Sequence, residues 1–186
     1  MTKISCCAGL CLAFIGSAAA VSASPFTANT GVPKVVTSSG LTAAEETSTP
    51  SQKSPGKNTL TFQGKSIRLV AITGPENDML SYRIGGRRNP TLVVSRGATI
   101  KLLFVNTDDD MAHNIRFGPA LKAYPNVMAA YLKASVGTLE LAHKSGTTYS
   151  ADELTLHLPA TPGAYVYLCT VRGHAQGGMV GKLVIQ

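Results

Sequence analysis

Three side chains that bind soft or borderline metals lie close together near the C-terminus. The segment CTVRGHAQGGM runs from Cys169 to Met179 and includes His174. Thiolate and imidazole bind both zinc and copper, whereas a thioether is a poor ligand for zinc and a good one for copper. One cysteine, two histidines and a weak axial methionine make up a blue copper site. The segment therefore predicts a copper site that needs a second histidine from elsewhere in the chain.

Three other histidines are candidates for this second position. His157 alternates with apolar residues in a β-like run, so it is expected on the solvent face of a strand. His143 lies in a polar segment and is expected to be solvated. His113 follows the acidic segment TDDDMA and precedes an apolar run, so it is expected at the end of a strand, as Cys169 is. The residue types alone leave the choice open.

The elements that position these ligands are predicted to be short strands. The β-rich runs share a high content of aliphatic and aromatic residues and are bounded by Gly, Pro, Asn or Asp. They lie at residues 60–62, 67–72, 92–94, 100–105, 114–117, 154–158, 164–168 and 180–185. Many short strands with turn signals between them predict an all-β sandwich or barrel. The ligand segment lies between the last two runs, and Gly173, Gly177 and Gly178 allow it to fold back on itself.

Two further parts of the chain differ from these runs in composition. Residues 120–136 are more helical than extended, so we expect a long connection there that carries a short helix. Residues 24–58 are rich in Ser, Thr, Ala, Pro and Lys and show no lasting hydrophobic period. This composition predicts a flexible tether. A short helix over residues 41–47 is the alternative there, although no apolar stripe supports it. Residues 59–186 form the expected metal-binding domain.

The N-terminus has the features of a secretory signal peptide. A lysine, an apolar stretch over residues 4–16 and a run of small residues follow one another. Residues 1–23 are therefore predicted to be a signal peptide, with cleavage after Ala20 or Ala23, and the protein is expected in the periplasm. The apolar stretch is shorter than the roughly 20 residues of a membrane span, and its retention as a membrane tether is the alternative.

Cleavage of the signal peptide changes the number of cysteines. Cys6, Cys7 and Cys11 leave with it, and Cys169 then has no partner for an internal disulfide. A lone thiol in an oxidising compartment is open to oxidation, and a bond to a metal would protect it. The cysteine count is therefore consistent with the predicted copper site.

The charge of the chain excludes one class of partner and favours another. The formal net charge is +7, and the basic residues are scattered rather than gathered in one run. Nucleic-acid binding favours a basic stripe with interleaved aromatic residues, and tryptophan is absent, so no nucleic-acid partner is predicted. A basic surface attracts an anionic partner through long-range electrostatic steering.

The pairing of His113-Asn114 with a later Cys-x4-His-x4-Met resembles the ligand pattern of the cupredoxins, the type 1 blue copper proteins. The resemblance extends over residues 59–186. The segments that carry it are TLTFQGKSIRLVA, RRNPTLVVSRGATIKLLFVNT and TPGAYVYLCTVRGHAQGGMVGKLVIQ. It implies a cupredoxin-like Greek-key β-sandwich of two sheets with copper near one end. It also implies His113, Cys169 and His174 as strong equatorial ligands and Met179 as a weak axial ligand.

The resemblance also implies how the site is held and used. The Asn114 side chain is expected to tie the two ligand-bearing loops together near Thr170, and the Asn114 backbone amide to point at the thiolate sulfur. His174 is the expected exit for electrons, with the charge of Arg172 near its exposed edge. Apolar or small residues could supply a docking patch around it. Those considered are Pro119, Pro159, Ala160 and Ala175.

The function implied is that of a one-electron carrier with one copper ion that alternates between Cu(I) and Cu(II). Its partners would be redox proteins such as c-type cytochromes or a terminal oxidase. An enzyme of the copper oxidase or nitrite reductase type needs further copper sites, which four histidines without a His-x-His pair do not provide within one chain. The alternatives are a copper carrier or metallochaperone, or an electron-transfer subunit of a larger oxidase complex.

Overall fold

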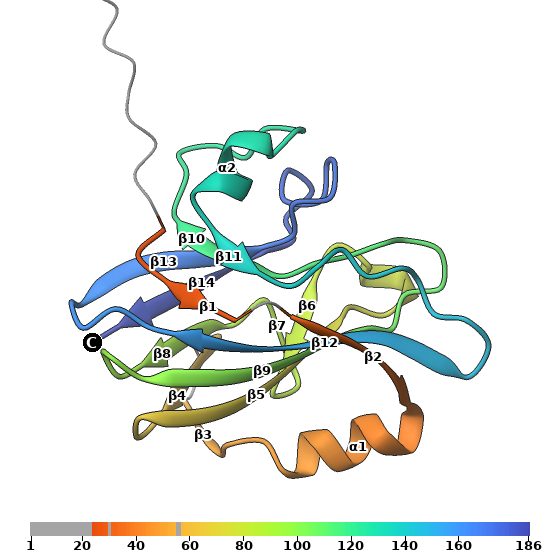
Figure 1. The fold of residues 1–186 in the computed structure, drawn as a ribbon, viewed down its shortest axis with the longest axis horizontal. Helices are drawn as coiled ribbons and strands as arrows, with labels where there is room; N and C mark the ends of the chain where they lie inside the picture. The colour runs from red at the N-terminus through yellow and green to blue at the C-terminus, as the bar shows by residue number, and fades with distance from the viewer. Residues whose placement is uncertain (1–23, 30, 55–56) are drawn as a thin grey trace, which may run out of the picture.

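Two β-sheets of seven strands each face one another in the computed structural model (Figure 1). The structure describes residues 24–29, 31–54 and 57–186. The predicted signal peptide, residues 1–23, lies outside the described residues and stays a prediction.

The first sheet has the strand order β1-β12-β9-β5-β6-β7, and β2 also pairs with β12. Its strands are β1 (Thr27–Ala28), β2 (Val32–Thr37), β5 (Ser66–Thr73), β6 (Tyr82–Ile84), β7 (Arg87–Arg88), β9 (Thr99–Asn106) and β12 (Thr148–His157). The second sheet has the order β11-β10-β13-β14-β8-β4-β3. Its strands are β3 (Ser51–Lys53), β4 (Thr59–Phe62), β8 (Thr91–Val94), β10 (Arg116–Pro119), β11 (Val136–Gly137), β13 (Gly163–Leu168) and β14 (Val180–Ile185).

The helical elements lie outside the two sheets (Figure 1). They are α1 (Ser38–Glu46), the single 3-10 turn η1 (Glu76–Asp78) and α2 (Ala129–Lys133). Helix α2 falls inside the connection where a short helix was expected. None of the helices in the described part of the chain has both the length and the apolar character that crossing a bilayer requires.

The strands are half-buried because apolar and polar residues alternate along them. Strands β4 and β5 bury every second residue, and β8 repeats the pattern. The buried side chains of both sheets meet in one continuous core between the layers. The largest fully buried side chains include Tyr82, Phe104, Phe117 and Tyr167, so the core is rich in aromatic rings. This core supports the loops at the ends of the sheets.

The predicted fold class is confirmed: the chain is a β-sandwich with a short helix in the long connection. The predicted runs correspond to β4, β5, β8, β9, β10, β12, β13 and β14. Strands β6 and β7 were not predicted, since they are only three and two residues long. Strand β10 begins at Arg116 rather than Asn114, because the Asn114 side chain is used between loops, as described below.

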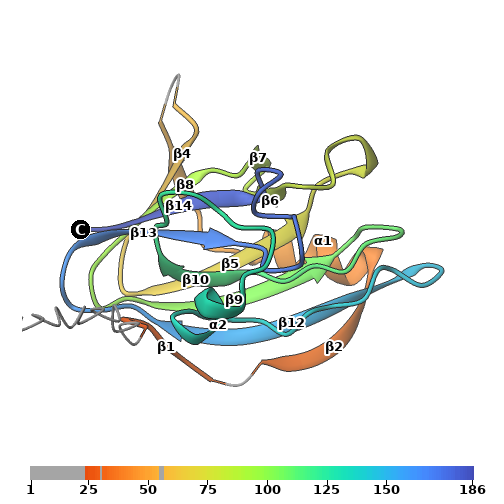
Figure 2. The same ribbon diagram turned by 90° about the horizontal axis from the view of Figure 1, so that it is seen from above.

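The largest difference from the sequence prediction lies in residues 24–58, which were expected to form a flexible tether. In the structure β2 forms six antiparallel residue pairs with β12, from Thr37–Thr148 to Val32–Glu153. Figure 2 shows β1 and β2 along the outer edge of the sheet beside β12. Helix α1 follows directly, with the Thr37 side chain accepting a hydrogen bond from the Gly40 amide as its N-cap. The segment is mostly exposed, so its order comes from backbone pairing, which composition does not reveal.

Replacement of Phe26 by Ala tests whether this N-terminal segment is part of the folded domain. Phe26 is buried, and its ring meets that of Tyr165 edge-on with centroids 4.8 Å apart. We expect Phe26→Ala to lower the free energy of unfolding by about 3 kcal/mol, as for other buried Phe truncations. Val35→Ala is the control, because Val35 is 70% exposed and its loss should change stability by less than about 0.5 kcal/mol. Equal urea midpoints for Phe26→Ala and the unmodified chain would support a tether instead.

Candidate metal centre

Strand register brings the predicted ligands to one end of the sandwich. Strand β10 pairs with β13 so that Arg116 lies opposite Leu168, and β13 pairs with β14 so that Leu168 also lies opposite Val180. Cys169 directly follows Leu168, and Met179 directly precedes Val180, the partner of Leu168, so both lie at the same end of the sheet. The residues just before β10, which include His113, emerge beside them. We call residues 169–179 the ligand loop; it joins β13 to β14 (Figure 1).

Three ligand atoms converge in this region. The donor atoms of His113, Cys169 and His174 all lie within 4.8 Å of one another. The Nδ1 atoms of the two imidazoles are 3.2 Å apart, and the Cys169 sulfur is 3.4 Å from Nδ1 of His174. His113 and Cys169 are fully buried, whereas His174 remains 8% exposed. The cluster is thus closed to solvent except at His174.

Hydrogen bonds of both its backbone and its ring hold His113 in place. Its N–H donates to the Leu141 carbonyl at 3.0 Å, and its own carbonyl accepts from the Leu141 N–H at 2.8 Å. Its other ring nitrogen, Nε2, lies 3.1 Å from a carboxylate oxygen of Asp108. His113 therefore sits on an isolated bridge to the segment around Leu141, three residues before β10, with Nδ1 left to face the cluster.

The Asn114 side chain joins the two ligand-bearing segments, as the resemblance implied. Its carbonyl oxygen accepts from the Thr170 backbone N–H at 2.8 Å, and its amide donates to the Thr170 hydroxyl at 2.9 Å. The backbone N–H groups of Asn114 and Val171 act as donors to the Cys169 sulfur. These donors favour the thiolate over the thiol, and such hydrogen bonds tune the potential of a bound metal.

The ligand loop also fixes Met179. Its carbonyl accepts from the Cys169 N–H at 3.2 Å, and its N–H donates to the His174 carbonyl at 3.0 Å. The Met179 side chain is fully buried and belongs to the same core cluster as Cys169. Gly173 and Gly178 adopt φ angles of 82° and 103°, which side chains other than glycine rarely tolerate. The predicted use of glycines to fold the loop back is confirmed at these two positions.

Burial sets the protonation of the cluster without a metal. Burial raises the pKa of the Cys169 thiol to about 11, although the N–H groups of Asn114 and Val171 act in the opposite direction. Burial and the neighbouring His113 lower the pKa of His174 to about 4. Burial also lowers the pKa of His113, against the effect of its carboxylate neighbour. At neutral pH the metal-free cluster is therefore a neutral thiol beside two neutral imidazoles.

The donor set fits copper. Thiolate and imidazole select copper or zinc over magnesium and calcium, which require oxygen ligands. In the described residues the cluster itself contains no carboxylate. The other two histidines do not join it: His143 and His157 are both exposed, and His157 lies near the Thr99 hydroxyl at the opposite end of β12. The structure thus brings together three of the four ligands named by the resemblance, His113, Cys169 and His174, and leaves these two histidines apart.

Two residues that support the site were not predicted from the sequence. Asn89 donates from its side chain to the Gly178 carbonyl in the ligand loop at 3.0 Å, and accepts from the Tyr82 N–H at 2.8 Å. Asp108 contacts His113 as described above. Asn89 gave no local signal, because its partner lies 89 residues away in the sequence. Asp108 was visible only as one of several acidic residues in a loop.

Solved structures with this fold are known. A structure described as a copper protein, rusticyanin, superposes with a TM-score of 0.75 and 25% identity, and covers 83% of this chain and 98% of that one. A structure of reduced rusticyanin gives a TM-score of 0.72 and 26% identity, covering 83% and 100%. The cupredoxin-like fold implied by the sequence resemblance is therefore confirmed, and within the cupredoxins the chain is similar to rusticyanin.

The sequence comparisons agree with the fold. Rusticyanin of Acidithiobacillus ferrooxidans is 32% identical over 142 residues, which cover 73% of this chain and 88% of the relative. Rusticyanin of Acidithiobacillus ferridurans is 30% identical and covers 73% of each chain. Residues 70–186 match the family described as copper binding proteins, plastocyanin/azurin family. The chain therefore belongs to the plastocyanin/azurin family of copper-binding proteins, the cupredoxins.

Proposed function

We propose that this protein is a type 1 blue copper protein that carries single electrons between redox partners. His113, Cys169 and His174 would be the equatorial ligands and Met179 the axial ligand. The observation that carries the proposal is the buried convergence of one sulfur and two Nδ1 atoms within 4.8 Å. When bound there, copper supplies a one-electron couple between Cu(I) and Cu(II).

The surroundings of these ligands suit electron transfer rather than catalysis. Paired strands hold both ends of the ligand loop, and hydrogen bonds from Asn114 and Asn89 hold its beginning and end. Ligands fixed in this way change little between oxidation states, which keeps the reorganisation on electron transfer small. Because the cluster is closed to solvent except at His174, it offers a substrate little access. Buried ligands likewise disfavour a metallochaperone, which must exchange its metal readily.

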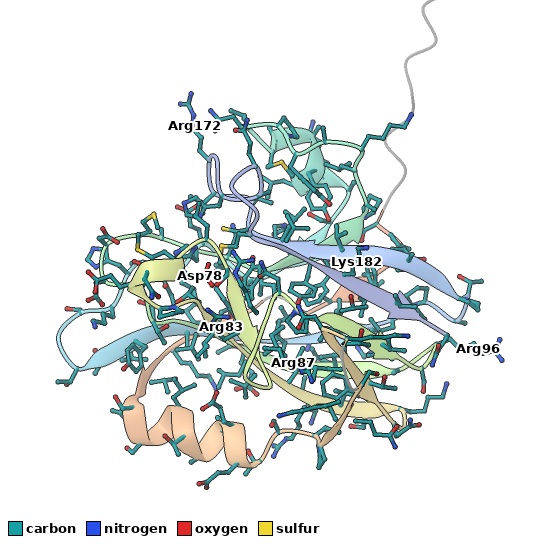
Figure 3. The ribbon with its side chains drawn as sticks, turned by 180° about the vertical axis from the view of Figure 1, so that it is seen from behind. Asp78, Arg83, Arg87, Arg96, Arg172 and Lys182 are labelled. Atoms are coloured by element: carbon teal, nitrogen blue, oxygen red, sulfur yellow. The ribbon has the colours of Figure 1, made fainter. Side chains whose placement is uncertain are left out.

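The edge of His174 is the proposed exit for electrons. Arg172 projects from the ligand loop away from the sheets (Figure 3), and would place a positive charge beside a docked partner. An apolar groove of about 300 Å³ is lined by Met128, which belongs to the same buried cluster as Ala175 of the ligand loop. The groove therefore lies near the ligand loop. Pro119 lines this groove as well.

The other two residues considered for a docking patch do not lie at this end. Pro159 and Ala160 follow the end of β12, where His157 pairs with Thr99 at the start of β9. The copper ligands lie at the other end of β9, beyond Asn106. The patch is therefore proposed around the groove, without these two residues.

Export to the periplasm remains part of the proposal. It depends on the signal peptide predicted over residues 1–23, and cytochromes c or a terminal oxidase would be the partners met there. N-terminal sequencing of the protein recovered from the periplasm tests it. A start at residue 21 or 24 supports cleavage after Ala20 or Ala23, whereas recovery of the intact chain in the membrane fraction supports a retained anchor.

Two measurements test the proposed function directly. The copper-loaded protein should have an intense thiolate-to-copper absorption band in the red part of the visible spectrum, which bleaches on reduction. Reduced cytochrome c should reduce it with one electron per copper ion and without consumption of any further substrate. Copper binding without the visible band would contradict the type 1 site, and a normal band without electron exchange would favour storage or transport of copper.

Copper binding should weaken as the pH falls. Because the pKa of the Cys169 thiol is about 11, binding as a thiolate releases one proton at any lower pH. The apparent association constant for Cu(II) should therefore fall about tenfold per pH unit between about pH 8 and pH 5. Below about pH 4 the fall should steepen, because His174 must then lose a proton as well. Competition titrations with a chelator check this, and a constant affinity over the first range would contradict it.

A further inference from the structure

Asp108 places a buried carboxylate against the first of the proposed copper ligands. Its side chain has no exposed surface, and one oxygen, Oδ2, lies 3.1 Å from Nε2 of His113. The other oxygen, Oδ1, accepts from the backbone N–H groups of Asp110 and Met111, both at 3.0 Å. The carboxylate therefore has donors at both oxygens, an arrangement that favours its ionised form.

The position of Asp108 is fixed by the end of strand β9. The Asn106 side chain accepts from the Asp108 N–H at 3.1 Å. The same side chain donates to the carbonyls of Met111, Leu141 and Ala142 at 2.9, 3.1 and 3.0 Å. Asn106 thereby ties the loop that contains Asp108 to the segment that pairs with His113. The Asn106 side chain thus helps to hold the Asp108 carboxylate and the His113 imidazole in position relative to each other, independently of any metal.

This contact dictates which nitrogen of His113 carries the proton. An ionised carboxylate only accepts hydrogen bonds, so Nε2 must be the donor and Nδ1 must keep its lone pair. Nδ1 is the nitrogen that faces His174 in the cluster. A histidine ligand whose other ring nitrogen donates to a carboxylate is both oriented and made more basic.

From this geometry we infer that Asp108 is a positioning residue for copper: it fixes His113 as the Nε2–H tautomer and, through its buried negative charge, lowers the reduction potential. The charge acts across a single imidazole in a site closed to water. It stabilises Cu(II), the more positively charged state, more than Cu(I). The neighbouring Asp109 carries the same charge, but its side chain is 59% exposed and pairs with Lys144, so solvent screens it. The inference rests on the proposed copper site.

The substitution Asp108→Asn removes the negative charge and keeps the size of the side chain nearly unchanged. We expect the affinity of the Asp108→Asn variant for Cu(II) to fall about tenfold more than its affinity for Cu(I). For a one-electron couple, this tenfold change in the ratio of the two affinities corresponds to a rise in the reduction potential of about 59 mV. Asp109→Asn is the matched control, since it removes the same charge one residue away. In this variant the ratio of the affinities for Cu(II) and Cu(I) should change by less than about twofold. Voltammetry on the three proteins provides the measurement. Equal shifts for the two variants, or no shift for Asp108→Asn, would overturn the role of the buried charge.

Nitrogen-15 NMR of the copper-free protein tests the tautomer independently of copper. His113 of the unmodified chain should carry its proton on Nε2, and a proton on Nδ1 would overturn the inference even if Asp108→Asn fails to fold. In Asp108→Asn the single side-chain oxygen should turn to the two backbone donors, which directs the amide NH2 at Nε2 and shifts His113 toward the Nδ1–H form. Asp109→Asn should leave the tautomer unchanged. If copper does not bind at all, these signals still report on Asp108, so the two proposals can fail separately.

Discussion

Replacement of Cys169 by Ser should abolish the blue colour and leave a folded β-sandwich. The intense visible band needs a thiolate bonded to copper, and a serine hydroxyl at this position supplies neither the sulfur nor a ready anion. The fold should persist because its core is formed by apolar side chains of the two sheets. A buried hydroxyl in place of the thiol should cost about 1–3 kcal/mol of stability.

Visible absorption and circular dichroism check the two parts of this result. Complete loss of the band with unchanged β-sheet circular dichroism is the expected outcome for Cys169→Ser. His157→Ala is the control, because His157 is exposed at the other end of the sandwich and should leave the spectrum unchanged. A blue spectrum in Cys169→Ser, or its loss in His157→Ala, would mean that copper is bound by a different set of residues.

Replacement of Met179 should change the reduction potential without removing copper. A thioether at a long axial position donates weakly, so its main effect is on the balance between Cu(I) and Cu(II). Met179→Leu removes this donor and adds apolar surface, which disfavours Cu(II) and raises the potential. Met179→Gln offers a harder oxygen donor, which favours Cu(II) and lowers it. Each shift should be on the order of 59 mV, a tenfold change in relative affinity.

Voltammetry on the three proteins checks the order Leu above Met above Gln. His113, Cys169 and His174 remain in each variant, so all three should bind copper and stay blue. Met79→Leu is a suitable control and should leave the potential unchanged, since Met79 follows η1, outside the ligand loop and outside the loop that contains Asp108. Three identical potentials would show that Met179 is not the axial ligand, although it is buried in the same core cluster as Cys169.

Features that depend on local spacing could be predicted from the amino-acid sequence. Alternation of apolar and polar residues predicted most of the long strands, because burial on one face of a sheet requires a period of two. Cys169, His174 and Met179 lie in one short loop, and the glycines at 173 and 178 allow that loop to turn back. The chemistry of these three side chains is enough to indicate copper. The resemblance to cupredoxins then selected His113, since residue types alone leave the choice of the second histidine open.

Features that depend on distant partners emerge only from the folded chain. Residues 24–58 have the composition of a tether, yet β2 is ordered by backbone pairing with β12, which lies more than 100 residues later and shows no trace in the composition of β2. Asp108 is one of three adjacent aspartates in the sequence, and the hydrogen bonds around it alone distinguish it from the exposed Asp109. A hydrogen bond or a buried charge depends on which groups the folded chain brings within a few ångströms, and local sequence does not contain that information.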